Sequence, residues 1–300
     1  MRAGNQFGSA PRHRFKAMVN KQRKPTVKNA MSIDLEDWFC VHNLSGIIKR
    51  EDWDNCELRV LESTKLILNL LEKHHTHATF FVLGWVADRL PELILEIEEK
   101  GHEIAVHGYD HLLLTEITPS EFEQDLVKAL AAIQKCGIKQ ALLGFRAPSF
   151  TVVENTRKWA LETLERHGFK YDSSIFPIGF HPDYGVADAP LAPYKITEKL
   201  HEFPMSCLEV LGRRFPFSGG GYFRLFPYSY TKLCMKRCNA QGRSAIFYLH
   251  PWELDPGQPR VKLSPSKAIR HYRNLDQTER RLDALLGDFQ FTTVREVLGL

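Results

Sequence analysis

The stretch Asn29-Ala-Met-Ser-Ile-Asp-Leu-Glu-Asp-Trp-Phe39 decides how the rest of the chain is interpreted. Its apolar start predicts a strand over 27–33, and the carboxylates Asp34, Glu36 and Asp37 follow where that strand should end. In a sheet of parallel strands, ligands and catalytic groups gather at the carboxyl-terminal edge. Three carboxylates crowded there repel one another unless a cation, an arginine or a shared proton offsets the charge. We therefore expect such a partner elsewhere in the chain.

Strand-like and helix-like segments alternate beyond this stretch. The pattern predicts strands over 78–83, 103–106, 141–145, 169–171, 245–249 and 289–291, and helices over 59–73, 91–100, 121–135, 155–166, 264–286 and 294–298. Thr118-Pro-Ser-Glu121 is a capping box, which should begin one of these helices. Regular alternation indicates an α/β fold with parallel strands and right-handed crossovers.

Between residues 176 and 243 the alternation stops and prolines and glycines become frequent. We interpret this region as an insertion across the mouth of the fold, with a short helix near 228–238. Residues 1–26 are basic and predicted to be a disordered tail. The remainder, 27–300, is predicted to be one domain that includes this insertion and the helix over 264–286.

The composition excludes several classes of protein. A hydrophobic content of 43% and a charged content of 25% are ordinary for a soluble globular protein of 300 residues. The net charge of +4 does not indicate a nucleic-acid partner, because much of the excess lies in the basic tail. No run is apolar enough to span a bilayer, and no secretory signal is evident. We therefore expect a cytoplasmic protein with six reduced cysteines, associated with a membrane at most through its substrate.

Further polar groups follow the predicted strands. His107 and His111 are spaced i, i+4, so that one helical turn would place both imidazoles on one face. Two histidines and a carboxylate with room for water make a catalytic divalent-metal site. Alone, such a pair is more often two solvated helix residues. Following a buried strand, in a chain with carboxylates at another strand end, it predicts metal ligation.

Arg146 and His250 also follow predicted strands. Arg146 could form a surface salt bridge, or its guanidinium could orient a catalytic carboxylate and keep it ionised. His250 could be a satisfied core histidine, or it could be a general acid. The carboxylates and histidines at the other strand ends favour the catalytic interpretation for both residues.

These blocks, in this order, resemble the polysaccharide deacetylases with a NodB-homology domain, a branch of the carbohydrate esterases. The resemblance covers 27–300 and includes the motifs Ala78-Thr-Phe-Phe-Val-Leu-Gly-Trp85, Gly144-Phe-Arg-Ala-Pro-Ser-Phe150 and Tyr248-Leu-His-Pro-Trp-Glu-Leu-Asp-Pro256. In detail it is similar to the subfamily encoded with bacterial exopolysaccharide biosynthesis and exosortase systems, which carries a C-terminal extension. The resemblance implies a distorted (β/α)7-type barrel with an elaborated C-terminal region.

The resemblance also implies roles for individual residues. Asp34 matches the catalytic base, Arg146 the arginine that orients it, His250 the acid, and His107 and His111 two metal ligands. The common family motif has adjacent aspartates, whereas Leu35 follows Asp34 here, so Glu36 is the expected third ligand and Asp37 the alternative. Gly108 stands where the family usually has Ser or Thr, which removes a hydroxyl that could brace the loop.

Other residues beside these blocks are candidates for substrate binding. Sugars stack their apolar faces on aromatic rings, although each ring alone is more often part of a core. A backbone N–H near Ser149 is expected to hold the oxyanion, and Asp172 to orient His250 or to cap a strand end. The predicted substrate-binding set is Tyr109, Ser149, Phe150, Asp172, Tyr222, Phe223 and Trp252.

The sequence thus predicts a metal-dependent N-deacetylase acting on an acetylated amino-sugar polysaccharide or its lipid-linked precursor. Zinc is the expected metal, and cobalt, nickel or manganese would fit the same ligands. One alternative is a metal-independent hydrolase of a small non-peptide amide on the same fold. Another is a non-catalytic saccharide-binding protein, although a binder gains nothing from a base and an acid.

Overall fold

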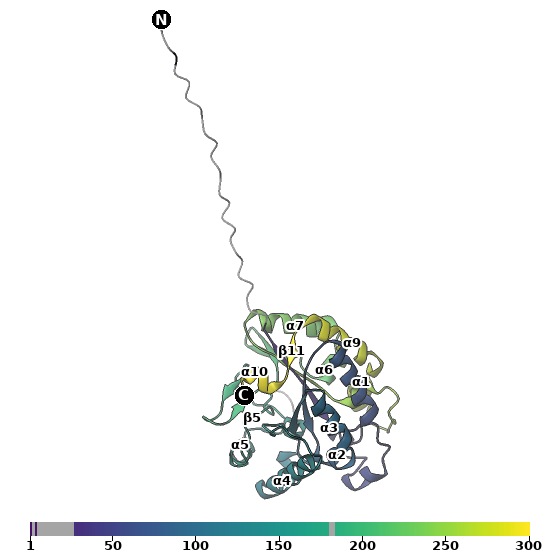
Figure 1. The fold of residues 1–300 in the computed structure, drawn as a ribbon. Helices are drawn as coiled ribbons and strands as arrows, with labels where there is room; N and C mark the ends of the chain where they lie inside the picture. Colours follow the sequence, from purple (N-terminus) through teal and green to yellow (C-terminus); the bar gives the residue numbers. More distant parts are fainter. Residues whose placement is uncertain (2–3, 5–26, 180–183) are drawn as a thin grey trace.

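The computed structural model describes residues 1, 4, 27–179 and 184–300, and its main feature is a curled sheet of nine strands (Figure 1). The strand order is β10 (Ile246–Leu249), β1 (Asn29–Leu35), β2 (Thr79–Val82), β3 (Glu103–Val106), β4 (Gly144–Phe145), β5 (Tyr171–Asp172), β7 (His201–Glu202) and β6 (Tyr194–Lys195), with β11 (Phe291–Thr292) also paired to β1. All pairs are parallel except β6 with β7. The sheet is a half-barrel, which confirms the predicted distorted barrel. Most of the predicted tail lies outside the described residues.

Helices cover the outer face of this sheet. They are α1 (Val60–Lys73), α2 (Gly84–Arg89), α3 (Pro91–Glu99), α4 (Pro119–Lys135) and α5 (Arg157–Arg166), with short 3-10 turns at His42–Leu44, Arg50–Asn55, Leu114–Glu116 and Pro148–Phe150. The predicted capping box is present at the start of α4, where the Glu121 amide donates to Thr118 Oγ1 and the Thr118 amide donates to Glu121 Oε2. Helices α1, α3, α4 and α5 begin and end close to the predicted positions, whereas α2 was not predicted.

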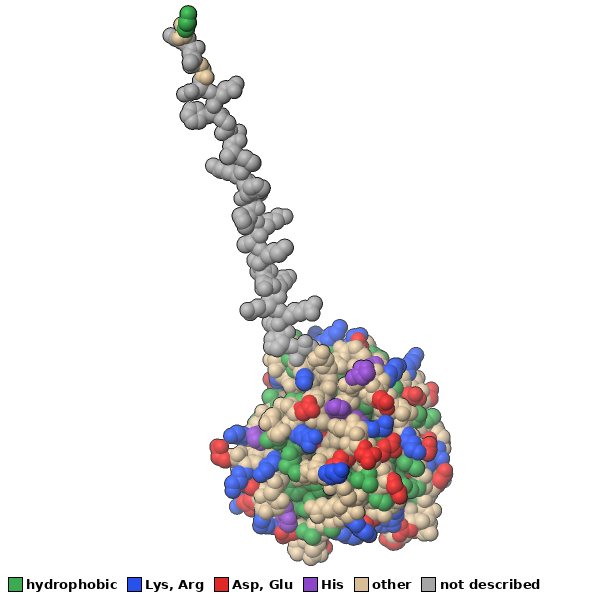
Figure 2. Space-filling model, in the orientation of Figure 1, with side chains coloured by type: hydrophobic (Ala, Val, Ile, Leu, Met, Phe, Trp, Pro, Cys, Tyr) green, Lys and Arg blue, Asp and Glu red, His purple; other side chains and the backbone are tan. Residues whose placement is uncertain are grey.

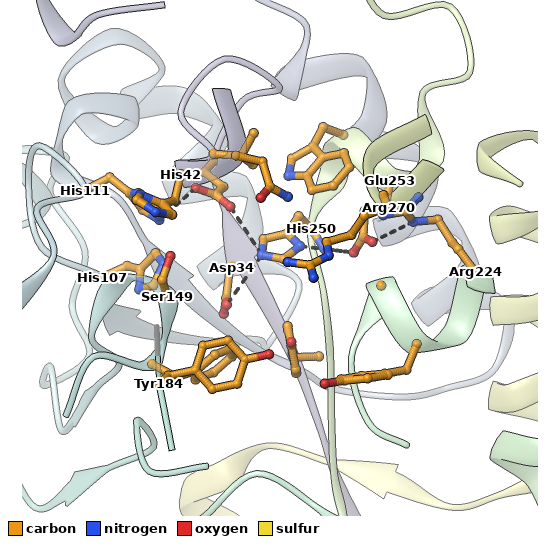
Figure 3. A pocket seen from close by; sticks show the side chains of 18 of the residues that line it. Asp34, His42, His107, His111, Ser149, Tyr184, Arg224, His250, Glu253 and Arg270 are labelled. Atoms are coloured by element: carbon orange, nitrogen blue, oxygen red, sulfur yellow. Dashed lines mark hydrogen bonds and ion pairs between the residues drawn. The ribbon is translucent and has the colours of Figure 1, made fainter. Parts of the chain in front are cut away.

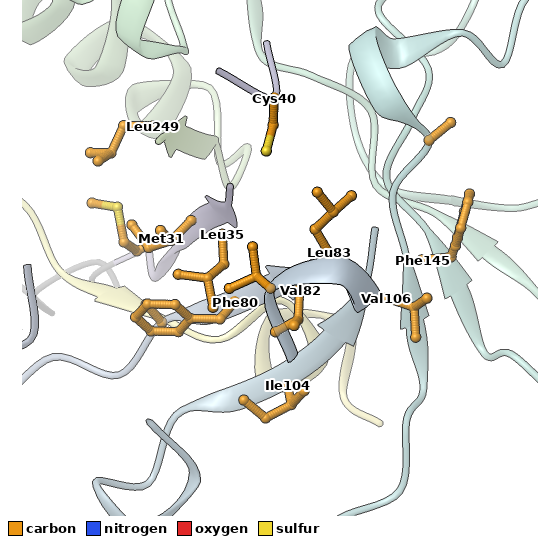
Figure 4. Packing of buried hydrophobic residues seen from close by; sticks show 14 of the residues in the cluster. Met31, Leu35, Cys40, Phe80, Val82, Leu83, Ile104, Val106, Phe145 and Leu249 are labelled. Carbon is orange, nitrogen blue, oxygen red and sulfur yellow. The ribbon is translucent and has the colours of Figure 1, made fainter. Parts of the chain in front are cut away.

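The alternation of side chains along β1 separates two cores. Met31, Ile33 and Leu35 join the hydrophobic cluster that packs under the outer helices (Figure 4). Ala30 belongs instead to the cluster inside the curled sheet, with Phe81 of β2. Because successive residues of a strand point to opposite faces, Ser32 and Asp34 share the inner face with Ala30. The period of two therefore directs Asp34 into the barrel.

The C-terminal half completes the sheet and also adds to it. The region 176–243 was predicted to be an insertion, but β7 lies within it and pairs in parallel with β5, so part of it belongs to the central sheet. The other elements there are β6, which pairs with β7, a hairpin of β8 (Cys207–Val210) and β9 (Arg213–Pro216), and the helices α6 (Gly220–Leu225) and α7 (Tyr228–Ala240). Strands of two residues, such as β7, are too short to leave an alternating pattern.

The single helix predicted over 264–286 is wrong, because two helices occupy that region. They are α8 (Pro265–Tyr272) and α9 (Leu275–Asp288), and the short closing helix α10 (Val294–Leu298) follows. Asn274 adopts a left-handed conformation with φ of 55°, and its Nδ2 donates to the Arg224 carbonyl at 2.6 Å. Arg224 in turn donates to the Arg273 carbonyl at 3.0 Å. A tertiary contact therefore ends α8.

The surface in Figure 2 carries acidic and basic side chains interspersed over the visible face. No helix among the described residues is both long and apolar enough to cross a membrane.

Candidate active site

The carboxyl-terminal ends of three strands converge on one cavity of about 260 Å³ (Figure 3). Asp34 lies near the end of β1 and Glu36 just beyond it. His107 follows β3 and His250 follows β10, and all four residues line the cavity. These strands lie close together in the sheet, so residues that are far apart in the sequence meet at one edge.

Glu36, His107 and His111 form a cluster suited to a metal ion. Their potential ligand atoms all lie within 4.8 Å of one another. Burial lowers the pKa of His107 to about 4 and that of His111 well below its usual value, so both imidazoles are held in the neutral form that binds metals. Burial also raises the pKa of Glu36 to about 8, and its Oε2 lies 3.1 Å from His111 Nε2. A divalent cation would favour the ionised form of this buried carboxyl group, so the three residues fit such an ion.

The loop that carries the two histidines is not helical, so the predicted helical turn is wrong. Gly108 has φ of 73° and His111 has φ of 54°, yet the two imidazole centroids lie only 5.4 Å apart. The His107 ring is oriented by its Nδ1, which lies 2.8 Å from the Arg146 carbonyl. A hydrogen bond at Nδ1 leaves Nε2 available for a metal.

Asp125 of α4 braces this loop. Its carboxylate accepts hydrogen bonds from the amides of Tyr109 and Asp110 at 2.8 and 3.0 Å. A Cβ on Gly108 would lie 2.8 Å from Asp125 Oδ2, at a φ that side chains rarely adopt. The glycine therefore leaves room for the carboxylate that replaces the expected hydroxyl brace.

Asp34 is paired with Arg146 below the cavity. Arg146 Nη1 lies 2.5 Å from Asp34 Oδ1, and both side chains are almost completely buried. The guanidinium also donates to Ser32 Oγ, to Ser173 Oγ and to the Ser173 carbonyl. Arg146 thus has partners on three sides, which hold the guanidinium in place against Asp34.

His250 stands beside both carboxylates. Its Nε2 lies 3.2 Å from Glu36 Oε1 and 3.8 Å from Asp34 Oδ2, while its Nδ1 lies 3.0 Å from Glu253 Oε2 (Figure 3). Burial alone would lower the pKa of His250, but the carboxylates of Glu36 and Glu253 outweigh it and raise the pKa to about 9. A protonated imidazole with its far nitrogen anchored is suited to donate a proton into the cavity.

Glu253 is itself anchored by Arg224 of α6. The Arg224 Nε donates to Glu253 Oε1 at 2.8 Å, and each side chain is 1% exposed. Although burial raises the pKa of Glu253, Arg224 and His250 hold it at about 2. The sequence analysis did not select this pair. The sequence feature that could have identified Glu253 is its position three residues after His250, in the 3-10 turn Pro251–Leu254.

Two predicted carboxylates have other partners. Asp37 accepts hydrogen bonds from the amides of Trp38, Arg59 and Val60 at 2.7 to 2.9 Å, so it ties the β1 loop to the start of α1. Asp172 does not contact His250, which corrects the orienting role. It accepts from Ser174 Oγ at 2.5 Å and is fully buried away from the cavity.

The predicted substrate-binding residues divide into two groups. Ser149, Phe150, Tyr222 and Trp252 line the cavity. The other three, Asp172, Tyr109 and Phe223, lie outside the cavity. The Tyr109 hydroxyl donates to Asp88, and Phe223 packs edge-on against Phe247 in the core.

Several cavity residues were not predicted. The main ones are His42, Asn43, Tyr184, Arg224, Glu253 and Arg270. They come from loops and from the C-terminal helices, where no strand end marked them in the sequence.

Comparison with known families defines the class of protein. A model described as polysaccharide deacetylase matches residues 53–171, and one described as a domain of unknown function (DUF3473) matches 173–299. Residues 53–171 are thus similar to the polysaccharide deacetylase family, and residues 173–299 are similar to DUF3473.

Individual relatives agree with this assignment. A peptidoglycan-N-acetylglucosamine deacetylase of Bacillus cereus is 33% identical over 102 residues, which are 34% of this chain and 37% of the relative. A peptidoglycan deacetylase of Helicobacter pylori is 34% identical over 120 residues, 39% of each protein. The matches thus span less than half of these relatives. The crystal structure of a putative polysaccharide deacetylase from Mycobacterium smegmatis shares the fold, with a TM-score of 0.52 and 21% identity over 88% of this chain and 93% of that chain.

Proposed function

We propose that this chain is a metal-dependent hydrolase that removes N-acetyl groups from an acetylated amino sugar. The observation that carries the proposal is the convergence, on one cavity, of the cluster Glu36–His107–His111, of Asp34 paired with Arg146, and of His250. A cation site, a base and an acid together can carry out metal-assisted hydrolysis of an amide. The names of the curated relatives support the same chemistry.

Glu36, His107 and His111 would hold the metal. Bound there, a divalent cation would supply Lewis acidity toward the acetamide carbonyl and lower the pKa of a neighbouring water. Zinc is the proposed ion because the ligands are imidazole and carboxylate, although cobalt, nickel and manganese accept the same donors.

Asp34 is the proposed general base. Arg146 binds its Oδ1, while Oδ2 is turned toward Nε2 of His250. In this arrangement Oδ2 takes the proton of the water that attacks the acetyl carbonyl carbon. The buried guanidinium keeps the carboxylate ionised before the transfer.

His250 is the proposed general acid. With Nδ1 held by Glu253, the proton at Nε2 passes to the amine nitrogen as the carbon–nitrogen bond breaks. The products are acetate and a free amino sugar. Ser149, with φ of 52°, lines the cavity, and we propose that its backbone N–H stabilises the oxyanion.

We further propose that the substrate is a polysaccharide of exopolysaccharide biosynthesis, or its lipid-linked precursor, and that the enzyme acts in the cytoplasm. Phe150 and Tyr222 supply rings on which sugars would stack, whereas the Trp252 ring is itself stacked against His250 and His271. Residues 27–300 would then act as one unit, because cavity residues come from both family matches.

Acetate release from N-acetylglucosamine oligomers, measured together with metal content, tests this function. We expect about one metal ion per chain and activity that is lost on chelation and restored by zinc. Glu36→Gln should lose the metal, whereas Asp37→Asn should retain it. A metal-free protein that hydrolyses non-sugar amides would point instead to the amide-hydrolase alternative.

A further inference from the structure

A cationic side chain on α8 enters the cavity and has no ion-pair partner among residues 27–179 and 184–300. Arg270 lines the cavity together with His250 and Tyr222 (Figure 3). Among the described residues, its guanidinium makes no ion pair, hydrogen bond or ring contact. An arginine presents five donors in a planar fork that matches a carboxylate or a phosphate. An unpaired arginine at this position is therefore available to a ligand.

The backbone of Arg270 is fixed by the same side chain that anchors the proposed acid. Arg224 donates from Nη2 to the Arg270 carbonyl at 3.1 Å and from Nη1 to the His271 carbonyl at 2.8 Å. Its Nε binds Glu253, which holds His250. One buried guanidinium thus sets the last turn of α8 relative to His250, so Arg270 enters the cavity from a defined position.

The segment of the chain that carries Arg270 is basic. Residues 256–275 contain no Asp or Glu, and their cations are Arg260, Lys262, Lys267, Arg270 and Arg273. Of these five, only Arg270 lines the cavity. Of the cavity carboxylates, Asp34 is paired with Arg146 and Glu253 with Arg224, while Glu36 belongs to the histidine cluster. The α8 side of the cavity therefore favours an anionic ligand group.

We propose that Arg270 binds an anionic substituent, a carboxylate or a phosphate, of the saccharide that this chain deacetylates. The inference rests on the proposed function and narrows its substrate class. A neutral N-acetylglucosamine oligomer would leave the guanidinium unused. A uronic acid next to the N-acetylated sugar, or a phosphate at its reducing end, would occupy it.

Binding measurements with two anionic probes and one neutral probe test the proposal. The probes are a hyaluronan tetrasaccharide, which carries glucuronate, N-acetylglucosamine 1-phosphate, and neutral N-acetylglucosamine oligomers. Dissociation constants are measured by calorimetry in an Asp34→Asn background, which prevents turnover. Arg270→Gln is compared with Lys267→Gln, the same change of charge at an exposed residue of α8 outside the cavity.

We expect Arg270→Gln to weaken binding of at least one anionic probe by about tenfold or more and to leave the neutral oligomer within about twofold. Lys267→Gln should change none of the three. An effect limited to the hyaluronan probe would identify a carboxylate, and one limited to the sugar phosphate a phosphate. Equal losses for neutral and anionic probes, no loss at all, or equal effects of the two variants would each overturn the proposal.

Acetate release by the wild-type chain separates this inference from the proposed function. If no N-acetylated probe is hydrolysed, the proposed function fails, while the dependence of anion binding on Arg270 is still measured. If the probes are hydrolysed but binding is independent of Arg270, only the present inference fails.

Discussion

At Asp34, the two carboxylate oxygens have different surroundings. Oδ1 is bound by Arg146 at 2.5 Å, and Oδ2 lies 3.8 Å from His250 Nε2. Two residues further on, Glu36 belongs to the histidine cluster. The intervening Leu35 packs into the helix-covered core. An Asp-x-Glu spacing therefore places a base and a ligand at one cavity, because alternate residues of an extended chain point to the same side.

Asp34→Asn tests the role of the base. Asparagine keeps an acceptor for Arg146 but cannot take a proton, so we expect kcat to fall by about 10²–10⁴-fold. Metal content should stay near that of the wild type, because Asp34 lies outside the ligand cluster. Acetate release and metal analysis on the same preparation measure both effects. A turnover close to that of the wild type would remove Asp34 from the mechanism.

Glu253→Gln tests the positioning of His250. The substitution weakens the charged contact to His250 Nδ1, so we expect kcat to fall by roughly 10²-fold with little change in KM and none in metal content. Glu279→Gln, at an exposed position of α9, is the matched control and should behave like the wild type. If both variants retain full kcat, His250 does not depend on Glu253.

At the level of elements, the loop between β3 and α4 places its histidines without a helix. Gly108 in the left-handed region and the carboxylate of Asp125 together shape this loop. Glycine occupies φ of 73° at little cost, whereas a side chain there is strained and would also meet Asp125. The loop conformation and the α4 carboxylate therefore depend on each other.

Gly108→Ala and Gly137→Ala form a matched pair. Gly137 has φ of 87°, with no atom near the position of an added Cβ, so its substitution carries only the backbone strain. Gly137→Ala should lose about 1–2 kcal/mol of unfolding free energy, and Gly108→Ala should lose more because its Cβ also meets Asp125. Only Gly108→Ala should also weaken metal binding and lower kcat. Denaturant unfolding and metal titration measure the two effects, and equal metal affinity in both variants would contradict the role given to this loop.

At the level of the whole molecule, the site joins segments that are distant in the sequence. The proposed ligands follow β1 and β3, the acid follows β10, and Arg224 connects the acid to the C-terminal helices. A ligand that binds only the folded state stabilises the whole domain. Metal binding should therefore raise the melting temperature, Tm, of the protein.

Removing the metal should lower Tm. At a free metal concentration about 100 times Kd the stabilisation is about 2.7 kcal/mol, and each kcal/mol shifts Tm by roughly 2–4 °C in a large domain. We expect a chelator to lower the Tm of the zinc-loaded wild type by several degrees and zinc to restore it. His107→Ala serves as the control and should show no zinc-dependent shift. An unchanged wild-type Tm would argue against a metal at these residues.

The sequence by itself determined the parts of this protein that depend on local pattern. The four-residue strands β2 and β3, the capped helix α4 and the strand-end positions of Asp34, His107, Arg146 and His250 all follow from hydrophobic periodicity and capping residues. Buried parallel strands leave continuous apolar runs, and polar groups directly after them stand out. The family resemblance rests on the same motifs, and the polysaccharide deacetylase model matches residues 53–171, which include His107 and Arg146.

Only the tertiary structure decided which distant side chains meet. The break between α8 and α9, the carboxylate behind His250 and the position of Arg270 all depend on Arg224, whose partners lie 29 to 49 residues away. Asp37 and Asp172 bear carboxylates like that of Glu36, but they accept hydrogen bonds from other groups. Backbone amides donate to Asp37, and a serine hydroxyl donates to Asp172. The sequence gives the chemical type of each side chain directly. The partners of a side chain are set by tertiary packing, which follows no periodic pattern along the chain.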